Sequence, residues 1–185
     1  TLSLTSIGDT ATITATVKDA AGSEVAGSTV TWATSAEGVA TVSTAGLVTA
    51  IANGSATITA TSGSVNATAT ATVSQVAASV TLAPTSLSFA SLSDTASLVP
   101  TVKDANDNSI SGVTVTWATS SSSVATVSSA GLVTTIADGS ATITATSGSV
   151  NQTATVTVSQ AAASVTLAPT SLSFASVDDT TTLVP

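Results

Sequence analysis

The sequence has no histidine, cysteine, tyrosine or methionine among its 185 residues, and only 6% of the residues are charged. Without cysteine the chain forms no disulfide and has no thiol nucleophile. Serine and threonine are abundant, but there is no histidine to activate them, and only a Ser–Lys arrangement stays open as a route to nucleophilic catalysis. We therefore predict no catalytic residues, no cofactor-binding residues and no enzyme activity.

Positively charged residues are equally scarce, since Lys18 and Lys103 are the only two. Ten acidic residues outnumber them and give a net charge of −8. Two cations cannot neutralise a run of phosphates, so the composition argues against nucleic-acid binding. The same deficit argues against docking on anionic lipid. The apolar residues nowhere form the run of about 18 or more that a membrane helix needs, so we expect no membrane insertion of this fragment.

What the sequence does contain is a repeat with a period of 85 residues. The segment TLAPTSLSFAS occurs at 81–91 and again at 166–176, and Trp32 and Trp117 have the same spacing. Self-similarity at a fixed period is typical of tandem structural units. We predict a repeat lacking its first strand at 1–75, a complete repeat at 76–160 and the first strands of a third at 161–185. Because both ends fall inside a repeat, we expect the parent chain to continue in both directions.

Apolar and hydroxyl side chains alternate through most of each repeat. The segment SATITATSGSVNQTATVTVS at 140–159 places Ala, Ile or Val at every second position of two runs, and a Ser-Gly pair separates the runs. This alternation predicts half-buried strands, and helical spacing is absent. Pro100 lies within one expected strand, which predicts an edge strand or a bulge there. The complete repeat should contain strands at 79–83, 86–89, 95–102, 113–119, 123–128, 131–136, 140–147 and 152–159.

Eight short strands in a unit of about 85 residues indicate an all-β domain made of two packed sheets, a β-sandwich. Such a small domain has little apolar surface to bury and is only marginally stable. Each copy carries one tryptophan on a middle strand. We therefore expect Trp32 and Trp117 to lie in the structural core of their repeats.

The segment VTVTWATSSSSVATVSSAGLVTTIADGSATITATSG at 113–148 resembles the bacterial immunoglobulin-like domain of group 2, which occurs as tandem repeats in invasin- and intimin-type surface proteins. The matching positions comprise a Val-x-Trp strand end, a Val-Ala-x-Val segment, a glycine turn and a Gly-x-Ala-x-Ile-x-Ala segment. The resemblance implies tandem Ig-like domains that act as extracellular spacers at the cell surface, without catalytic residues. The very low charge and the threonine-rich faces depart from many members of that family.

One loop offers a candidate calcium site. DANDNS at 104–109 supplies the oxygen-bearing side chains of Asp104, Asn106, Asp107 and Asn108, and Ca²⁺ prefers such ligands. The alternative is a polar hairpin turn whose residues tolerate unusual backbone angles. The first copy reads DAAGSE at 19–24, so a calcium site common to both copies is not expected.

These observations favour a structural function: a spacer or stalk module of a long, repetitive bacterial surface protein, either an adhesin rod or the building block of a surface filament. The alternative is a module that binds a carbohydrate or a host protein through its inter-strand loops. A sugar site usually offers an aromatic platform, and apart from the two tryptophans the only aromatic residues are Phe89 and Phe174. The sequence therefore favours the structural function.

The expected partners are neighbouring repeats of the same chain and further copies of the chain itself. The first repeat lacks the SVTLAP segment that opens the second, whereas residues 161–170 supply that segment again. A strand of one chain could therefore complete the sheet of another by β-augmentation, and self-association into fibres would follow. The alternative is that the missing segment reflects an arbitrary boundary of the sequence.

Overall fold

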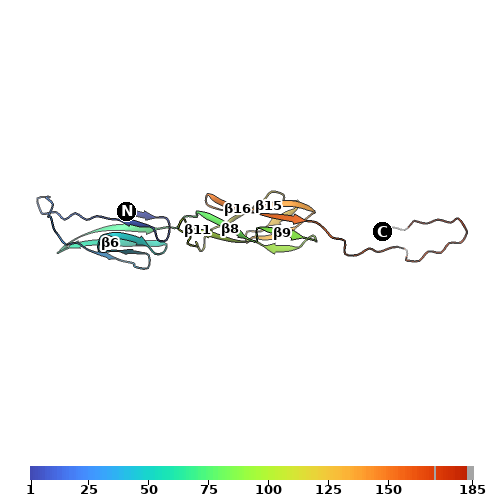
Figure 1. Ribbon diagram of the computed structural model, residues 1–185, viewed down its shortest axis with the longest axis horizontal. Helices are drawn as coiled ribbons and strands as arrows, with labels where there is room; N and C mark the ends of the chain where they lie inside the picture. The colour runs from blue at the N-terminus through green and yellow to red at the C-terminus, as the bar shows by residue number, and fades with distance from the viewer. Residues whose placement is uncertain (169, 183–185) are drawn as a thin grey trace.

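The computed structural model describes residues 1–168 and 170–182. Two β-rich repeats follow each other along the long axis of the molecule, and the C-terminal tail extends away from the second repeat (Figure 1). Within the described residues every regular element is a strand. No helix in this part of the chain is long and apolar enough to cross a membrane. The prediction of an all-β fold with tandem sandwich domains is confirmed.

One layer of the second repeat is a four-stranded sheet in the order β12-β15-β16-β9. Its centre is the hairpin of the two longest strands, in which apolar residues alternate with threonine so that one face is buried and the other is wetted. β9 pairs with β16 in the parallel direction, and Leu87 lies opposite Val156. The strands are β9 (Ser86–Phe89), β12 (Thr116–Thr119), β15 (Gly139–Ser147) and β16 (Val150–Val158).

The facing layer combines a three-stranded sheet, in the order β10-β14-β13, with the two-stranded pair of β11 and β8. β8 lies across β16 and β15 of the first layer. Its Val80 and Leu82 are buried in the space between the layers. The strands of this layer are β8 (Ser79–Ala83), β10 (Thr95–Ser97), β11 (Val99–Lys103), β13 (Ala125–Val127) and β14 (Leu132–Thr135).

The first repeat has the same four-stranded sheet, in the order β1-β7-β6-β3, and the same three-stranded sheet, in the order β2-β5-β4. It has no counterpart of β8 in the described residues, and residues 14–17, which correspond to 99–102, form no strand. The strands are β1 (Leu2–Leu4), β2 (Thr10–Thr12), β3 (Thr31–Thr34), β4 (Ala40–Val42), β5 (Leu47–Ala50), β6 (Gly54–Ser62) and β7 (Val65–Val73).

The strand prediction for 95–102 was wrong in one respect, because two strands occupy this segment. The chain leaves β10 at Ser97, and the backbone N–H of Leu98 donates to the carbonyl of Gly131. From Val99 the chain pairs with β8 in the other sheet of the same layer. Pro100 lies on this two-stranded pair, opposite Leu82, so it occupies an edge strand as predicted.

Aliphatic side chains, not the tryptophans, fill the centre of each repeat. The largest fully buried side chains of the second repeat include Leu98, Val133, Ile143 and Val156. Trp117 and Trp32 pack against the clusters of their repeats but are only half-buried. The expected position of each indole therefore needs correction from the middle of the core to its border.

The border position of Trp117 is coupled to a glycine turn. Gly131 has a φ of +81°, and a Cβ placed there would lie 2.5 Å from the carbonyl oxygen of Leu98 and 2.8 Å from Cζ2 of Trp117. Glycine is required for both reasons, because a side chain would be strained by the backbone angle and would collide with the indole. The glycine of the repeated Ala-Gly-Leu-Val segment thus leaves room for the indole next to the turn.

Candidate functional site: the junction between the repeats

The calcium candidates lie where the two repeats meet. Three segments converge there: the turn at 5–9 of the first repeat, the connecting segment around Gln75, and the loop at 104–109 of the second repeat. In Figure 1 this region lies between the repeat that contains β6 and the repeat that contains β8 and β11. The structure therefore assigns the loop a position between domains that the sequence alone did not reveal.

Asp104 is the centre of this junction and is only 2% exposed. One carboxylate oxygen, Oδ1, accepts hydrogen bonds from the backbone N–H groups of Asn106 at 3.0 Å and Asn108 at 2.9 Å, which shape the loop. The other, Oδ2, accepts from the backbone N–H of Ile7 at 2.9 Å and from Nε2 of Gln75 at 2.8 Å. One buried side chain thus joins its own loop to the preceding repeat and to the connecting segment.

The environment of Asp104 favours its ionised form. Burial acts to raise the pKa of the carboxyl group, but the hydrogen bond from Gln75 and those from the backbone N–H groups of Ile7, Asn108 and Asn106 outweigh burial and lower the pKa to about 2. Hydrogen bonds to a charged acceptor are stronger than those between neutral groups. The carboxylate is therefore charged at neutral pH and fully used as an acceptor.

The two asparagines of the loop add further bonds across the junction. Nδ2 of Asn106 donates to the carbonyl oxygen of Ile7 and to Oδ1 of Asp9, both at 3.0 Å. Nδ2 of Asn108 donates to the same Ile7 carbonyl at 2.9 Å. Both the N–H and the C=O of Ile7 are therefore bound by side chains of the second repeat. Such pairing of both groups fixes the distance and the rotation of one loop relative to the other.

Asp9 stabilises the turn of the first repeat that makes this contact. Its Oδ2 accepts from the backbone N–H groups of Thr5 and Ser6, both at 2.9 Å, and closes the turn that presents Ile7. The N–H of Thr5 is the main cause that lowers the pKa of Asp9, and the amide of Asn106 acts in the same direction. Asp9 therefore serves the local turn and the junction together.

Gln75 is held by a second pair of bonds. Its backbone N–H donates to Oδ1 of Asn53 at 2.8 Å, and Nδ2 of Asn53 donates to Oε1 of Gln75 at 3.0 Å. The side-chain amide is therefore oriented with its N–H group toward Asp104. Sequence reasoning missed Ile7, Asp9 and Gln75 as functional residues. The recurrence of Gln at the end of each repeat, as Gln75 and Gln160, is the signal that could have indicated the last of them.

The structure brings three of the four calcium candidates together, but it surrounds the acidic one with hydrogen-bond donors. Asp104 already accepts hydrogen bonds from five N–H groups, whereas the side chain of Asp107 is 87% exposed. Nζ of Lys103 lies 3.8 Å from Oδ1 of Asp107. Among the described residues, no group of three or more acidic side chains could hold a metal ion. The arrangement suits a hydrogen-bonded joint, and calcium binding stays a prediction to be tested.

At its outer end the first repeat has a loop with the same internal hydrogen bonds but without the two asparagines. Oδ1 of Asp19 accepts from the backbone N–H groups of Ala21 and Ser23, both at 2.9 Å, in the positions that correspond to Asn106 and Asn108. The loop is therefore shaped in the same way. The amide side chains that bind across the junction in the second repeat are replaced by a methyl group and a hydroxyl group.

The chain matches a known family of protein domains. The family model of the bacterial Ig-like domain (group 2) matches residues 11–73 and 76–158, together more than half of the chain. The matched family is one of structural domains. No curated protein matches the chain.

Several solved structures resemble the chain, each over only part of its own length. The surface layer protein SbsC, domains 1–6, is 28% identical, with 83% of this chain and 24% of that chain covered and a TM-score of 0.46. Invasin, a bacterial integrin-binding protein, is 19% identical, with 79% and 35% covered and a TM-score of 0.44. The Yersinia pseudotuberculosis adhesin InvE is 18% identical, with 85% and 56% covered and a TM-score of 0.42.

Proposed function

Because the chain belongs to the family of bacterial Ig-like domains of group 2, we propose that it is a spacer module of a long, repetitive bacterial cell-surface protein. The repeats supply length, and the junction holds successive repeats in line. An adhesin stalk and a surface filament both need these two properties. The chain carries out no reaction in this function.

The junction around Asp104 is the observation that supports this proposal. A flexible linker would allow the two repeats to move independently, and relative motion is the default for domains that share a small interface. Here Asp104, Asn106 and Asn108 make direct bonds to Ile7, Asp9 and Gln75 across the interface. A joint with donors and acceptors paired on both sides keeps the extended arrangement of Figure 1.

The dimensions of the repeat suit a spacer. β15 and β16 have nine residues each. At about 3.3 Å per residue, such a strand spans about 30 Å. Their alternating threonines leave a wetted, weakly charged outer face, which needs no ligand to be stable in water. Each added repeat therefore extends the molecule by a fixed step.

Small-angle X-ray scattering of the chain tests the rigid joint. We expect the unaltered chain to have a single, extended maximum dimension. Asp104→Ala should give a broader distribution of interatomic distances, because it removes both hydrogen bonds that Oδ2 accepts. Asp107→Ala is the matched control, since it removes an exposed carboxylate of the same loop without touching the junction. Identical scattering from all three proteins would contradict the rigid joint.

Labelling of intact cells tests the location. An antibody against the repeats should label the surface of unbroken cells of the source organism, and labelling that requires lysis would contradict the proposal. A glycan array probed with the chain addresses the alternative function. Specific binding to one glycan would favour a binding module over a spacer.

A further inference from the structure

We propose that Asn53 is a self-modifying residue of the junction, and that its conversion to aspartate by deamidation loosens the contact between the two repeats. This inference rests on the proposed function, because it concerns the joint that holds successive repeats in line. It is carried by the residue that follows Asn53, by the hydrogen bonds of the Asn53 side-chain amide, and by the aspartate at the matched position of the second repeat.

The sequence around Asn53 favours deamidation. Asn53 lies in the bend directly before Gly54, the first residue of β6. Asparagine is a chemically labile residue. Deamidation begins when the backbone nitrogen of the following residue attacks Cγ of the asparagine, and a side chain on that residue hinders the attack. Gly54 has no side chain. The other asparagines of the sequence precede Ala, Asp, Ser or Gln: Asn66, Asn106, Asn108 and Asn151.

The reaction needs only water as a co-reactant. The backbone nitrogen of Gly54 forms a bond to Cγ of Asn53 and loses its proton to the solvent, while the bond from Cγ to Nδ2 breaks and Nδ2 leaves as ammonia. Water then opens the succinimide ring at one of its two carbonyl groups. Opening at Cγ gives aspartate, and opening at the backbone carbonyl gives isoaspartate. Asn53 and Gly54 are both exposed, so water reaches the site.

The amide group that this reaction removes orients Gln75. Nδ2 of Asn53 donates to Oε1 of Gln75 at 3.0 Å, and Nε2 at the other end of the Gln75 amide donates to Oδ2 of Asp104 at 2.8 Å. Oδ1 of Asn53 accepts the backbone N–H of Gln75 at 2.8 Å, which identifies the opposite end of the Asn53 amide as the donor. The Gln75 amide therefore links Asn53 to the centre of the junction.

A carboxylate at position 53 breaks this link. Carboxylate oxygens only accept hydrogen bonds, so Oε1 of Gln75 loses its donor and faces a negative charge. The side-chain amide of Gln75 then lies between two carboxylates. When the amide rotates to donate to residue 53, its N–H group leaves Asp104, and a buried acceptor loses a partner. The new charge also repels the carboxylate of Asp104. Each effect weakens the contact between the repeats.

The second repeat shows that the fold accepts the product. Asp138 and Gln160 occupy the positions of Asn53 and Gln75. Oδ1 of Asp138 accepts the backbone N–H of Gln160 at 2.8 Å, as Oδ1 of Asn53 does for Gln75. The long strand that follows begins at the matched glycine in both repeats. Conversion of Asn53 to aspartate therefore changes the side-chain link to Asp104 and leaves the repeat folded.

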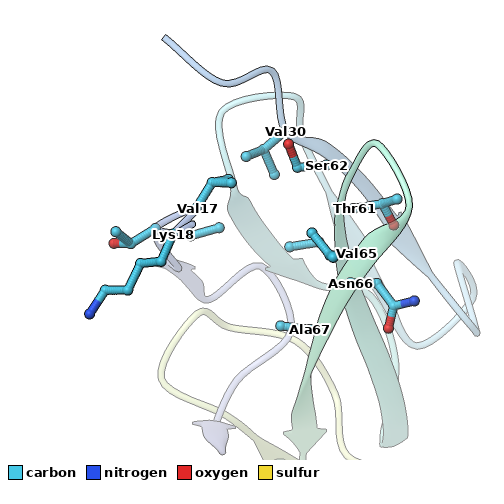
Figure 2. Close-up of a pocket in the computed structure, with 11 residues that line it drawn as sticks. Val17, Lys18, Val30, Thr61, Ser62, Val65, Asn66 and Ala67 are labelled. Carbon is cyan, nitrogen blue, oxygen red and sulfur yellow. The ribbon is translucent and has the colours of Figure 1, made fainter. Parts of the chain in front are cut away.

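Asn66 is the matched control in the same repeat. It is exposed, and the methyl group of Ala67 hinders the attack on its Cγ. Gly54 pairs with Val73 at one end of the β6–β7 hairpin, whereas Asn66 pairs with Thr61 near the other end, away from Gln75. Figure 2 shows the side-chain amide of Asn66 directed away from Lys18. A charge introduced at Asn66 thus tests the effect of charge without touching the junction.

Peptide mass mapping of the whole chain after storage at mildly alkaline pH tests the site. Digestion beside the small aliphatic residues separates Asn53 from Asn66. The peptide with Asn53 should convert to aspartate and isoaspartate forms several-fold faster than the peptide with Asn66. Equal rates for the two peptides, or no conversion of Asn53, would overturn the proposal.

Small-angle X-ray scattering tests the link to the joint. Asn53→Asp carries the product from the outset and should show a broader distribution of interatomic distances than the fresh unaltered chain. Asn66→Asp adds the same charge and should match the unaltered chain, and circular dichroism checks that both variants are folded. Storage should broaden the scattering of the unaltered chain in proportion to the conversion of Asn53, and should change Asn53→Asp much less.

Two results would contradict the proposal alone: a narrow distribution for Asn53→Asp equal to that of Asn66→Asp, or conversion of Asn53 in the stored chain without broadening. A fresh unaltered chain that already shows the broad distribution would contradict the rigid joint, and this proposal with it. The failure of the proposed function is therefore read from the fresh chain, and the failure of the deamidation proposal from the variants and the stored chain.

Discussion

The two repeats have nearly the same sequence over their shared part, and only the second includes the opening residues 76–85. Both form the four-stranded and three-stranded sheets, and only the second contains the pair of β8 and β11. The absence of one strand of five residues leaves residues 14–17 without strand structure and leaves counterparts of buried residues half-exposed. The core of this fold therefore depends on a strand contributed by the first few residues of each repeat. Predictions that compare matched residues test this dependence.

The largest effect is expected from Leu82→Ala in β8. Leu82 is buried between the layers, so its truncation should lower the free energy of unfolding of the second repeat by about 2–5 kcal/mol. Leu167→Ala removes the same atoms from the same sequence in the exposed tail and should change it by less than about 0.5 kcal/mol. Urea denaturation, monitored by the fluorescence of Trp117 in a Trp32→Phe background, measures both changes in the free energy of unfolding. Equal effects would show that β8 is not a core strand.

A somewhat smaller loss is expected from Gly131→Ala. The positive φ and the collision with Trp117 and the Leu98 carbonyl should together cost about 2–4 kcal/mol. Gly148→Ala is the control: its φ is +58°, no atom lies within 4 Å of the added Cβ, and strain alone should cost about 1–2 kcal/mol. Thermal unfolding of both variants gives the difference. A Gly131→Ala protein as stable as the control would mean that the indole does not lie on this turn.

The junction should loosen in acid before the repeats unfold. The pKa of Asp104 is lowered to about 2 in the folded chain, against an ordinary value of 3.8, so its contribution is complete above about pH 4 and is lost as the pH falls toward 2. Scattering measured between pH 5 and pH 2 should show the loss of the extended state over this interval. Asp104→Asn should be less ordered already at pH 5 and should lack the transition. An unchanged transition in that variant would assign it to another group.

No effect at all is expected from calcium. Both oxygens of Asp104 are occupied by N–H donors, and Asp107 lies outside the junction. Addition of Ca²⁺ in calorimetry should release no heat and should leave the melting temperature unchanged. A stabilisation that disappears in Asp104→Ala but persists in Asp107→Ala would restore the calcium site.

Much of this fold follows from local patterns in the sequence. The alternation of apolar residues and threonine placed β8 and β9 at their observed bounds, and the period of 85 identified the units. The break between β10 and β11 at Leu98 could not be predicted. The alternation of apolar and polar residues continues through Leu98, although the chain changes its pairing partner there from β14 to β8. The choice of partner depends on residues distant in the sequence, such as Val133 and Thr81.

The role of Asp104 was hidden for the same reason. Its loop has the composition of a cation site, and only the folded chain shows that its partners include N–H groups 97 and 29 residues away. The border position of Trp117 also escaped prediction, since it depends on the glycine turn at Gly131, which is distant from β12 in the fold's chain order. Local periodicity determines the strands, whereas contacts between distant segments determine what a polar loop does.

The loop of the second repeat carries Asn106 and Asn108 where the loop of the first repeat carries Ala21 and Ser23, so a junction formed by the first loop would have fewer cross-links than the junction formed by the second. When such a chain is pulled from its ends, tension reaches every joint equally, and the joint with fewer cross-links yields first. The mechanical response is therefore set by the loops and not by the sandwiches. A few substitutions in a loop of six residues would change where the molecule bends under load while every domain remains folded.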